Sequence, residues 1–183
     1  MQLLIPDPTY DHPERSKEEF LIELRTELKG LSSEFNLIDA DAGHGADWPV
    51  VLAILGGLFF LAKPINENIN AWLALAKKLG GMVERVRKKW GAARLDERGC
   101  ILLALNRLME THKGPIRSLE LMGTVQALFQ VFPWKDPKRL DHHPDALYVI
   151  GFRVNDERIH ILGVKSKGTV EFEKDFSINY MDF

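Results

Sequence analysis

The sequence contains a single cysteine, Cys100, which excludes an intramolecular disulfide framework and a cysteine-rich zinc site. It also lacks a long apolar segment, because the longest run without polar side chains has fifteen residues and a bilayer span needs about 20. The amino end has no basic stretch before its short apolar run, so we expect no secretory signal. These absences favour a cytoplasmic protein without membrane association.

Motifs that mark common enzyme classes are missing as well. The chain has no phosphate-binding P-loop, no dinucleotide glycine fingerprint, no His-Glu-x-x-His and no Gly-x-Ser-x-Gly. We therefore favour a non-enzymatic protein and expect no cofactor.

Charge is present in both signs, but it is distributed unevenly along the chain. Residues 1–62 carry a net charge of −7, residues 63–117 carry +7 and residues 118–183 carry −2. Opposite blocks of this kind favour compensation within the chain or between two copies. A pI near 6.3 is lower than expected of a nucleic-acid-binding domain.

The first 45 residues predict a β-α-β piece. Strands are expected at Gln2–Pro6 and at Phe35–Ala40. Between them, Ser16 and the acid three residues later form a capping-box pattern, and apolar residues recur at helical spacing over about 16–31.

An uncharged run, Trp48–Ala62, follows. Its length, its sharp charged boundaries and Pro49 near its start predict a central helix that is buried on every side.

The clearest helical pattern comes next. Eight apolar residues alternate at spacings of four and three: Ile65, Ile69, Trp72, Ala76, Leu79, Val83, Val86 and Trp90. This seam predicts a long helix, either packed in its own helical hairpin, which we favour, or forming an oligomer contact. A further helix is expected from about Asp96 to His112, which completes a helical block over residues 46–114.

Residues 115–183 predict mainly β structure. Ile116–Met122 and Val125–Phe132 are interpreted as two short strands. Three strands over about 147–154, 158–164 and 169–176 then form an antiparallel meander. In the last of them Val170 and Phe172 are expected to face inward, and Glu171, Glu173 and Asp175 outward.

The fold class is therefore α+β, in one domain over residues 1–183. We expect a β-α-β piece, a three-helix block with one long helix, and a three-stranded meander. The N-terminal and C-terminal strands are expected to share one sheet, with the helices on one face.

A basic cluster surrounds the carboxyl half of the long helix. It consists of Lys77, Lys78, Arg85, Arg87, Lys88, Lys89 and Arg94. On the heptad these residues are spread over several positions rather than one stripe. A nucleic-acid-binding regulator is therefore an alternative, and not the favoured function.

A second alternative rests on four residues of one loop: Asp141, His142, His143 and Asp145. Imidazole and carboxylate groups together hold divalent metals that activate water. The triplet Asp141-His142-His143 resembles the signature of the Asp-His-His phosphoesterases, which would imply a metal-dependent hydrolase. That family also needs upstream aspartates in spaced pairs, for which Asp39 and Asp41 are the only analogue. Because nothing else supports this analogue, we favour a solvated loop without metal. His160, on a predicted strand, is interpreted as structural.

The favoured function is a non-enzymatic cytosolic interaction or regulatory protein. Its contact surface is predicted on the apolar side of the long helix, at Ile69, Trp72, Leu79, Val83, Val86 and Trp90. The partner would be a second copy, in a homo-oligomer, or a specific protein such as an effector or toxin.

Overall fold

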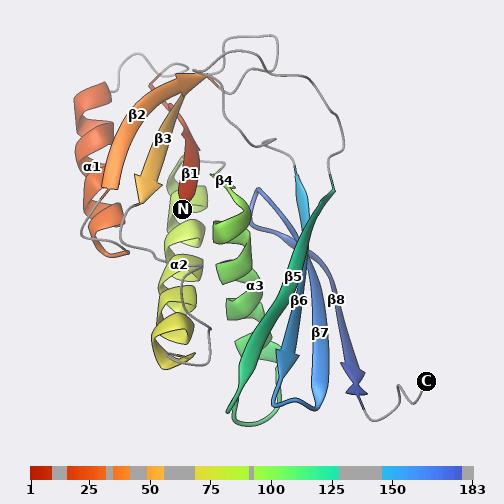
Figure 1. Cartoon of the computed structure of the whole chain (residues 1–183). Coiled ribbons are helices and arrows are strands. Elements are labelled where there is room, and N and C mark those ends of the chain that lie inside the picture. Colours follow the sequence, from red (N-terminus) through yellow and green to blue (C-terminus); the bar gives the residue numbers. More distant parts are fainter. Residues whose placement is uncertain are drawn as a thin grey trace.

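The chain is an α+β protein with two antiparallel sheets, and the helices of residues 69–90 and 97–111 lie between them (Figure 1). The computed structural model describes residues 1–9, 16–31, 35–41, 49–55, 69–90, 93–127 and 146–178. In chain order the elements are β1 (Gln2–Pro6), α1 (Lys17–Lys29), β2 (Phe35–Asp41), β3 (Pro49–Leu55), α2 (Ile69–Trp90), β4 (Arg94–Leu95), α3 (Glu97–Thr111), β5 (Leu119–Ala127), β6 (Leu147–Val154), β7 (Arg158–Lys165) and β8 (Val170–Ser177).

The first sheet has the strand order β2-β3-β1-β4, with every pair antiparallel. The predicted elements at β1, α1 and β2 are confirmed. Helices α1 and α2 contact each other, since the Phe20 and Trp90 rings meet edge to face at 5.6 Å. Ser16 precedes α1 as predicted, but its side chain makes no capping hydrogen bond.

The prediction of a helix over Trp48–Ala62 is wrong for the part of this segment that the structure describes. Pro49–Leu55 is strand β3, which lies between β2 and β1. Val51 packs in the main core on one face of this strand, and Leu52 packs in a second apolar cluster on the other. A strand buried on both faces has no polar alternation, so its sequence resembles that of a buried helix. Residues 56–62 lie outside the described part of the chain.

Helix α2 confirms the long helical pattern from Ile69 onward, whereas Ile65 lies outside the described residues. Its seam faces the interior of the same chain. Leu79 is fully buried, and Val83 and Val86 are buried with it in the core that α2 shares with α3. This is the intramolecular hairpin that the sequence favoured.

Helix α3 runs antiparallel to α2 and begins where Asp96 caps it (Figure 1). The Asp96 carboxylate accepts hydrogen bonds from the backbone N–H of Gly99 at 2.9 Å and of Gln2 at 2.7 Å. The Asp96 side chain therefore caps the amino end of α3 and connects this end to β1. Cys100 is buried as predicted, and burial raises the pKa of its thiol well above the usual value.

The second sheet has the order β5-β6-β7-β8, all antiparallel. The predicted meander corresponds to β6, β7 and β8, and the turn between the first two has positive φ angles at Asn155 and Asp156. Two expectations are wrong. Ile116–Met122 and Val125–Phe132 are not two separate strands where they are described, because the single strand β5 runs from Leu119 to Ala127 with a bulge after Leu121. Residues 128–132 lie outside the described part of the chain. The N-terminal and C-terminal strands form separate sheets.

The facing of β8 differs from the prediction at Phe172, Glu173 and Asp175, whereas Val170 faces inward and Glu171 outward as predicted. The Glu173 carboxylate accepts a hydrogen bond from the Thr111 hydroxyl of α3, and Asp175 lies beside the buried His160. Both acids therefore point toward the helices. Phe172 points to the opposite side, where its ring covers Gly163 of β7. The cause is a register shift in the β7–β8 pairing at Gly163 and Val164.

The main core joins both sheets and all three helices. It contains Leu3 of β1, Leu24 of α1, Leu79 of α2, Leu105 of α3 and Phe152 of β6. Within the described ranges no helix combines the length and the apolar character needed to cross a bilayer.

Candidate functional site

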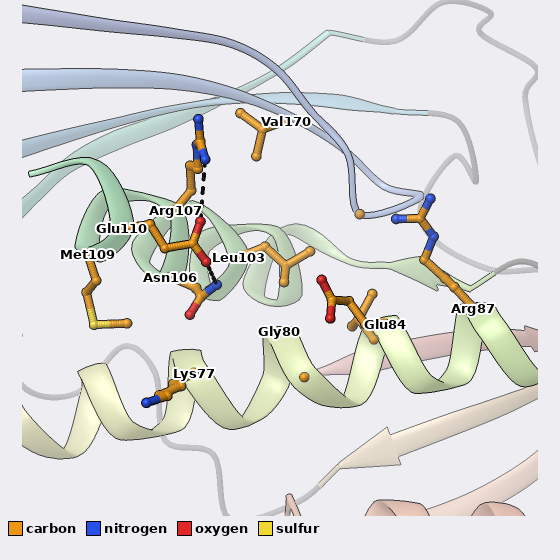
Figure 2. Close-up of a pocket in the computed structure, with 13 residues that line it drawn as sticks. Lys77, Gly80, Glu84, Arg87, Leu103, Asn106, Arg107, Met109, Glu110 and Val170 are labelled. Carbon is orange, nitrogen blue, oxygen red and sulfur yellow. Dashed lines mark hydrogen bonds and ion pairs between the residues drawn. The ribbon is translucent and has the colours of Figure 1, made fainter.

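A groove of about 650 Å³ lies between α2, α3 and the turn that joins β7 to β8 (Figure 2). This volume is within the range of small-ligand sites. Gly80 and Gly81 of α2 line its centre, and Leu103 and Val170 add apolar walls. Figure 2 shows Lys77 at one end of the groove and Arg87 at the other.

Some charged side chains in this groove have ion-pair or hydrogen-bond partners, and others have none among the described residues. Glu110 accepts a hydrogen bond from Asn106 at 3.0 Å and pairs with Arg107 at 3.4 Å. In contrast, no described residue forms an ion pair or a hydrogen bond with Lys77 or Glu84. Arg87, which also lines the groove, has no ion pair or hydrogen bond with a described residue either. The groove therefore retains two cations and one carboxylate on the same helix.

The glycines of α2 set how closely the two helices approach. A Cβ atom at Gly80 would lie 3.0 Å from the Asn106 side-chain nitrogen, whereas one at Gly81 would lie 3.6 Å from its nearest neighbour, Arg85. Gly80 thus allows α3 to approach α2 closely, whereas a Cβ atom at Gly81 would make an ordinary contact with Arg85.

The basic cluster is divided among different surroundings. Arg85 pairs with Glu27 at 2.9 Å and Lys89 pairs with Glu23 at 3.0 Å, so α2 contacts the acidic face of α1. This is compensation within the chain, as the charge blocks favoured. Three further members are exposed along α2, namely Lys78, Arg87 and Lys88, while Arg94 is half-buried in β4.

The predicted contact surface on the long helix is largely inside the protein. Four of its six residues are buried in the core: Leu79, Val83, Val86 and Trp90. Ile69 and Trp72 are half-buried and pack against the same core. A partner that contacts the folded chain would meet only the edge of this surface.

A different apolar surface is exposed on the second sheet. We name it the outer face, defined by Met122 and Val125 of β5, Val149 of β6, Ile159 and Ile161 of β7, and Phe172 and Phe176 of β8. The strand register places these side chains on the side opposite α3 (Figure 1). Val125 is 67% exposed, Met122 47%, Phe176 41% and Phe172 38%.

Ion pairs border the outer face. Arg153 pairs with Glu120 at 3.0 Å near one end, and Lys165 pairs with Glu171 at 2.9 Å near the other. Lys174 is the charge on this face that has no ion pair with a described residue. The face therefore has an apolar centre, a polar border and little net charge.

His160 lies on the inner side of β7, where 3% of it is exposed. Neither of its ring nitrogens has a hydrogen-bond partner among the described residues, and Asp175 Oδ1 is 3.5 Å from Nε2. The ring of His112, the residue that follows α3, meets it edge to face, with the ring centroids 5.4 Å apart. Burial lowers the pKa of His160, and His112 and Arg158 add to this, while Asp175 and Glu173 oppose it.

We expect the stability of the protein to fall as the pH drops below about 6.5, because the unfolded state then binds a proton that the folded His160 resists. For one proton the slope is at most about 1.4 kcal/mol per pH unit. Urea unfolding of the wild type and His160→Phe at about pH 7.5 and about pH 5.5 measures this. Equal pH dependence in both proteins would contradict the assignment.

The alternative metal site cannot be placed. Asp141, His142, His143 and Asp145 lie outside the described residues. Among the residues that are described, no cluster of three or more His, Cys, Asp or Glu side chains has the arrangement of a metal site.

No protein-family model, curated protein or solved structure matches the chain.

Sequence reasoning missed both the groove and the outer face. The glycine pair at Gly80–Gly81 was a usable signal for the groove, since glycine inside a helix often accompanies close approach of a neighbour. Gly151 and Gly163 in central strands were a signal for the outer face, because Met122 and Phe172 from the flanking strands cover them.

Proposed function

We propose that the protein is a non-enzymatic cytosolic interaction protein whose contact surface is the outer face. The observation that carries this is the exposure of four large apolar side chains on one side of one sheet: Met122, Val125, Phe172 and Phe176. Large contiguous apolar patches usually mark interaction sites. An apolar centre bordered by ion pairs is also the usual anatomy of a protein interface.

The partner that fits best is a second copy of the chain. The Arg153–Glu120 and Lys165–Glu171 pairs neutralise most of the charge around the outer face. Two such faces meet without strong repulsion, whereas a nearly neutral surface offers little to attract a partner of opposite charge. Two antiparallel sheets packed face to face would exclude water from both.

The size of the outer face limits the strength of this dimer. Strands β6, β7 and β8 have eight residues each. Four strands of about this length cover roughly 27 Å by 19 Å, or about 500 Å². Stable interfaces bury about 800 Å² on each partner. We therefore expect a micromolar rather than a nanomolar dissociation constant.

Sedimentation equilibrium of the wild type across micromolar concentrations tests the proposal. The expected result is a concentration-dependent mass that rises from 20.9 kDa toward twice that value. A monomer at every concentration would contradict self-association, and the outer face would then need a different partner.

The other two functions have weaker support. A nucleic-acid-binding regulator needs basic side chains along one exposed face, but Arg85 and Lys89 are engaged by the acids of α1. The hydrolase would use the loop at Asp141-His142-His143, which lies outside the described residues, and it stays a prediction.

A further inference from the structure

The buried imidazole of His160 is poorly suited to carry a charge in the folded chain. It is 3% exposed, and neither Nδ1 nor Nε2 is hydrogen-bonded to a described residue. A buried polar group without a partner costs free energy, and the cost is larger when the group is charged. The protonated ring has two N–H donors, whereas the neutral ring has one. Protonation therefore creates a demand for acceptors that the neutral ring does not have.

The side chains around His160 do not meet this demand. Asp175 Oδ1 of β8 lies 3.5 Å from Nε2, but this carboxylate already accepts two hydrogen bonds from Arg158. On β6, the residue directly opposite is the uncharged Phe152. The ionisable groups that face His160 are His112 after α3, Arg158 on β7, and Asp175 and Glu173 on β8.

A short segment packs against the His160 ring. We name it the strap and define it as residues 112–114. Its first residue is His112, whose ring lies edge to face on that of His160. His112 is half-buried, whereas Lys113 and Gly114 are exposed. Gly114 has a φ of 122°, which suits glycine, and a Cβ atom there would meet nothing within 4 Å. The strap therefore has free space beside it.

The chain is fixed on both sides of the strap. Before it, the Thr111 hydroxyl and the Arg107 guanidinium donate hydrogen bonds to the Glu173 carboxylate of β8. After it, the Asn155 side chain donates a hydrogen bond to the Pro115 carbonyl at 2.9 Å. None of these bonds involves His160, so a movement of the strap leaves α3 and the second sheet in place.

We infer that the strap covers neutral His160 and swings away when His160 takes up a proton. Water then reaches the ring nitrogens and supplies the acceptors that the closed arrangement lacks. The imidazolium also gains distance from His112, and water screens it from Arg158. This device is on the inner side of the second sheet and is separate from the outer face.

The direction of the pH dependence follows from the closed arrangement. Burial lowers the pKa of His160 there, whereas a water-exposed histidine titrates at about 6.5. The open form therefore binds the proton more tightly than the closed form. Below about pH 6.5 the ratio of open to closed chains should rise by up to about tenfold per pH unit, until the closed form is also protonated.

Nuclear magnetic resonance of the full chain tests this inference. At about pH 7.5 we expect a nuclear Overhauser effect between the ring protons of His112 and His160, and at about pH 5 we expect its loss. The amide shifts of α2 and of the first sheet should remain those of the folded chain at both pH values. His160→Phe removes the titrating group and keeps an aromatic ring, so the ring contact with His112 should persist at both.

Two exposed or half-exposed carboxylates provide a matched pair of further variants. Asp175→Asn removes a charge that favours protonated His160 in the closed form, so the contact should be lost at higher pH. Asp156→Asn removes an exposed carboxylate that is not among the groups facing His160, and should change nothing. The inference is overturned if the wild type keeps the contact at about pH 5, if it loses it only on global unfolding, if His160→Phe loses it equally, or if both carboxylate variants shift its loss equally.

Discussion

Replacing Leu79 with aspartate is expected to abolish the cooperative fold. Leu79 is fully buried in the main core, which α2 shares with both sheets. The substitution removes packing worth about 3–5 kcal/mol and buries an unpaired carboxylate at a further cost of several kcal/mol. The total is comparable with the whole stability of a domain of this size. Urea unfolding followed by circular dichroism should show no folded baseline.

Two other substitutions make this result specific. Leu79→Ala should keep the fold and lower the free energy of unfolding by about 3 kcal/mol. Lys78→Asp introduces the same carboxylate one residue earlier, at an exposed position, and should change stability by less than about 0.5 kcal/mol. A folded Leu79→Asp protein that has lost only its self-association would mean that the seam is an interface rather than core.

Val125→Lys is expected to weaken the dimer by at least about a hundredfold. The side chain is 67% exposed in one copy, so the free chain tolerates lysine. In the dimer the same position lies within an apolar contact, and a buried ammonium group without a partner costs about 3 kcal/mol or more. Sedimentation equilibrium should then show a monomer at concentrations where the wild type associates.

Ile22→Lys provides the matched control for this variant. Ile22 is 62% exposed, but it belongs to α1, away from the outer face. Its replacement should leave both the mass and the unfolding midpoint unchanged. Equal effects of the two substitutions would show that association depends on overall charge rather than on the outer face.

Most of the elements were predictable from short-range patterns, and β3 shows why one was not. Helical spacing identifies α1 and α2, because each has one buried side. Helix α3 is buried on all sides from Gly99 to Leu105, and Asp96 marks its start. Val50–Leu55 has two buried sides, and the apolar run alone does not distinguish a central strand from a buried helix. The distinction depends on β1 and β2 pairing with it, which is a tertiary property.

The facing of Phe172 and Glu173 in β8 was unpredictable for a related reason. Alternation assigns Phe172 to the interior and Glu173 to solvent, since apolar residues usually face the core. The register shift at Gly163, together with Thr111 and Arg107 on α3, places Glu173 on the inner side. The alternation of residues within a strand does not indicate which polar side chains a neighbouring helix places next to that strand.

The candidate sites likewise divide into features that follow from the sequence and features that depend on tertiary placement. Opposite charge blocks anticipated that the basic and acidic segments would meet, as Arg85–Glu27 and Lys89–Glu23 do, but not which residues would pair. The groove and the outer face arise from how helices and strands are placed. The seam that includes Leu79 has the clearest apolar pattern in the sequence, and the structure buries it in the main core.

The most direct test of the account is an isotope-filtered NOE experiment on a dimer of one ¹³C-labelled and one unlabelled copy. It detects methyl groups that lie within a few ångströms of the other copy. The account predicts intermolecular cross-peaks at Met122, Val125, Ile159 and Ile161 of the outer face. Cross-peaks confined to other methyl groups, such as those of Ile22 or Ile38, or their absence from a sample with the mass of a dimer, would contradict it.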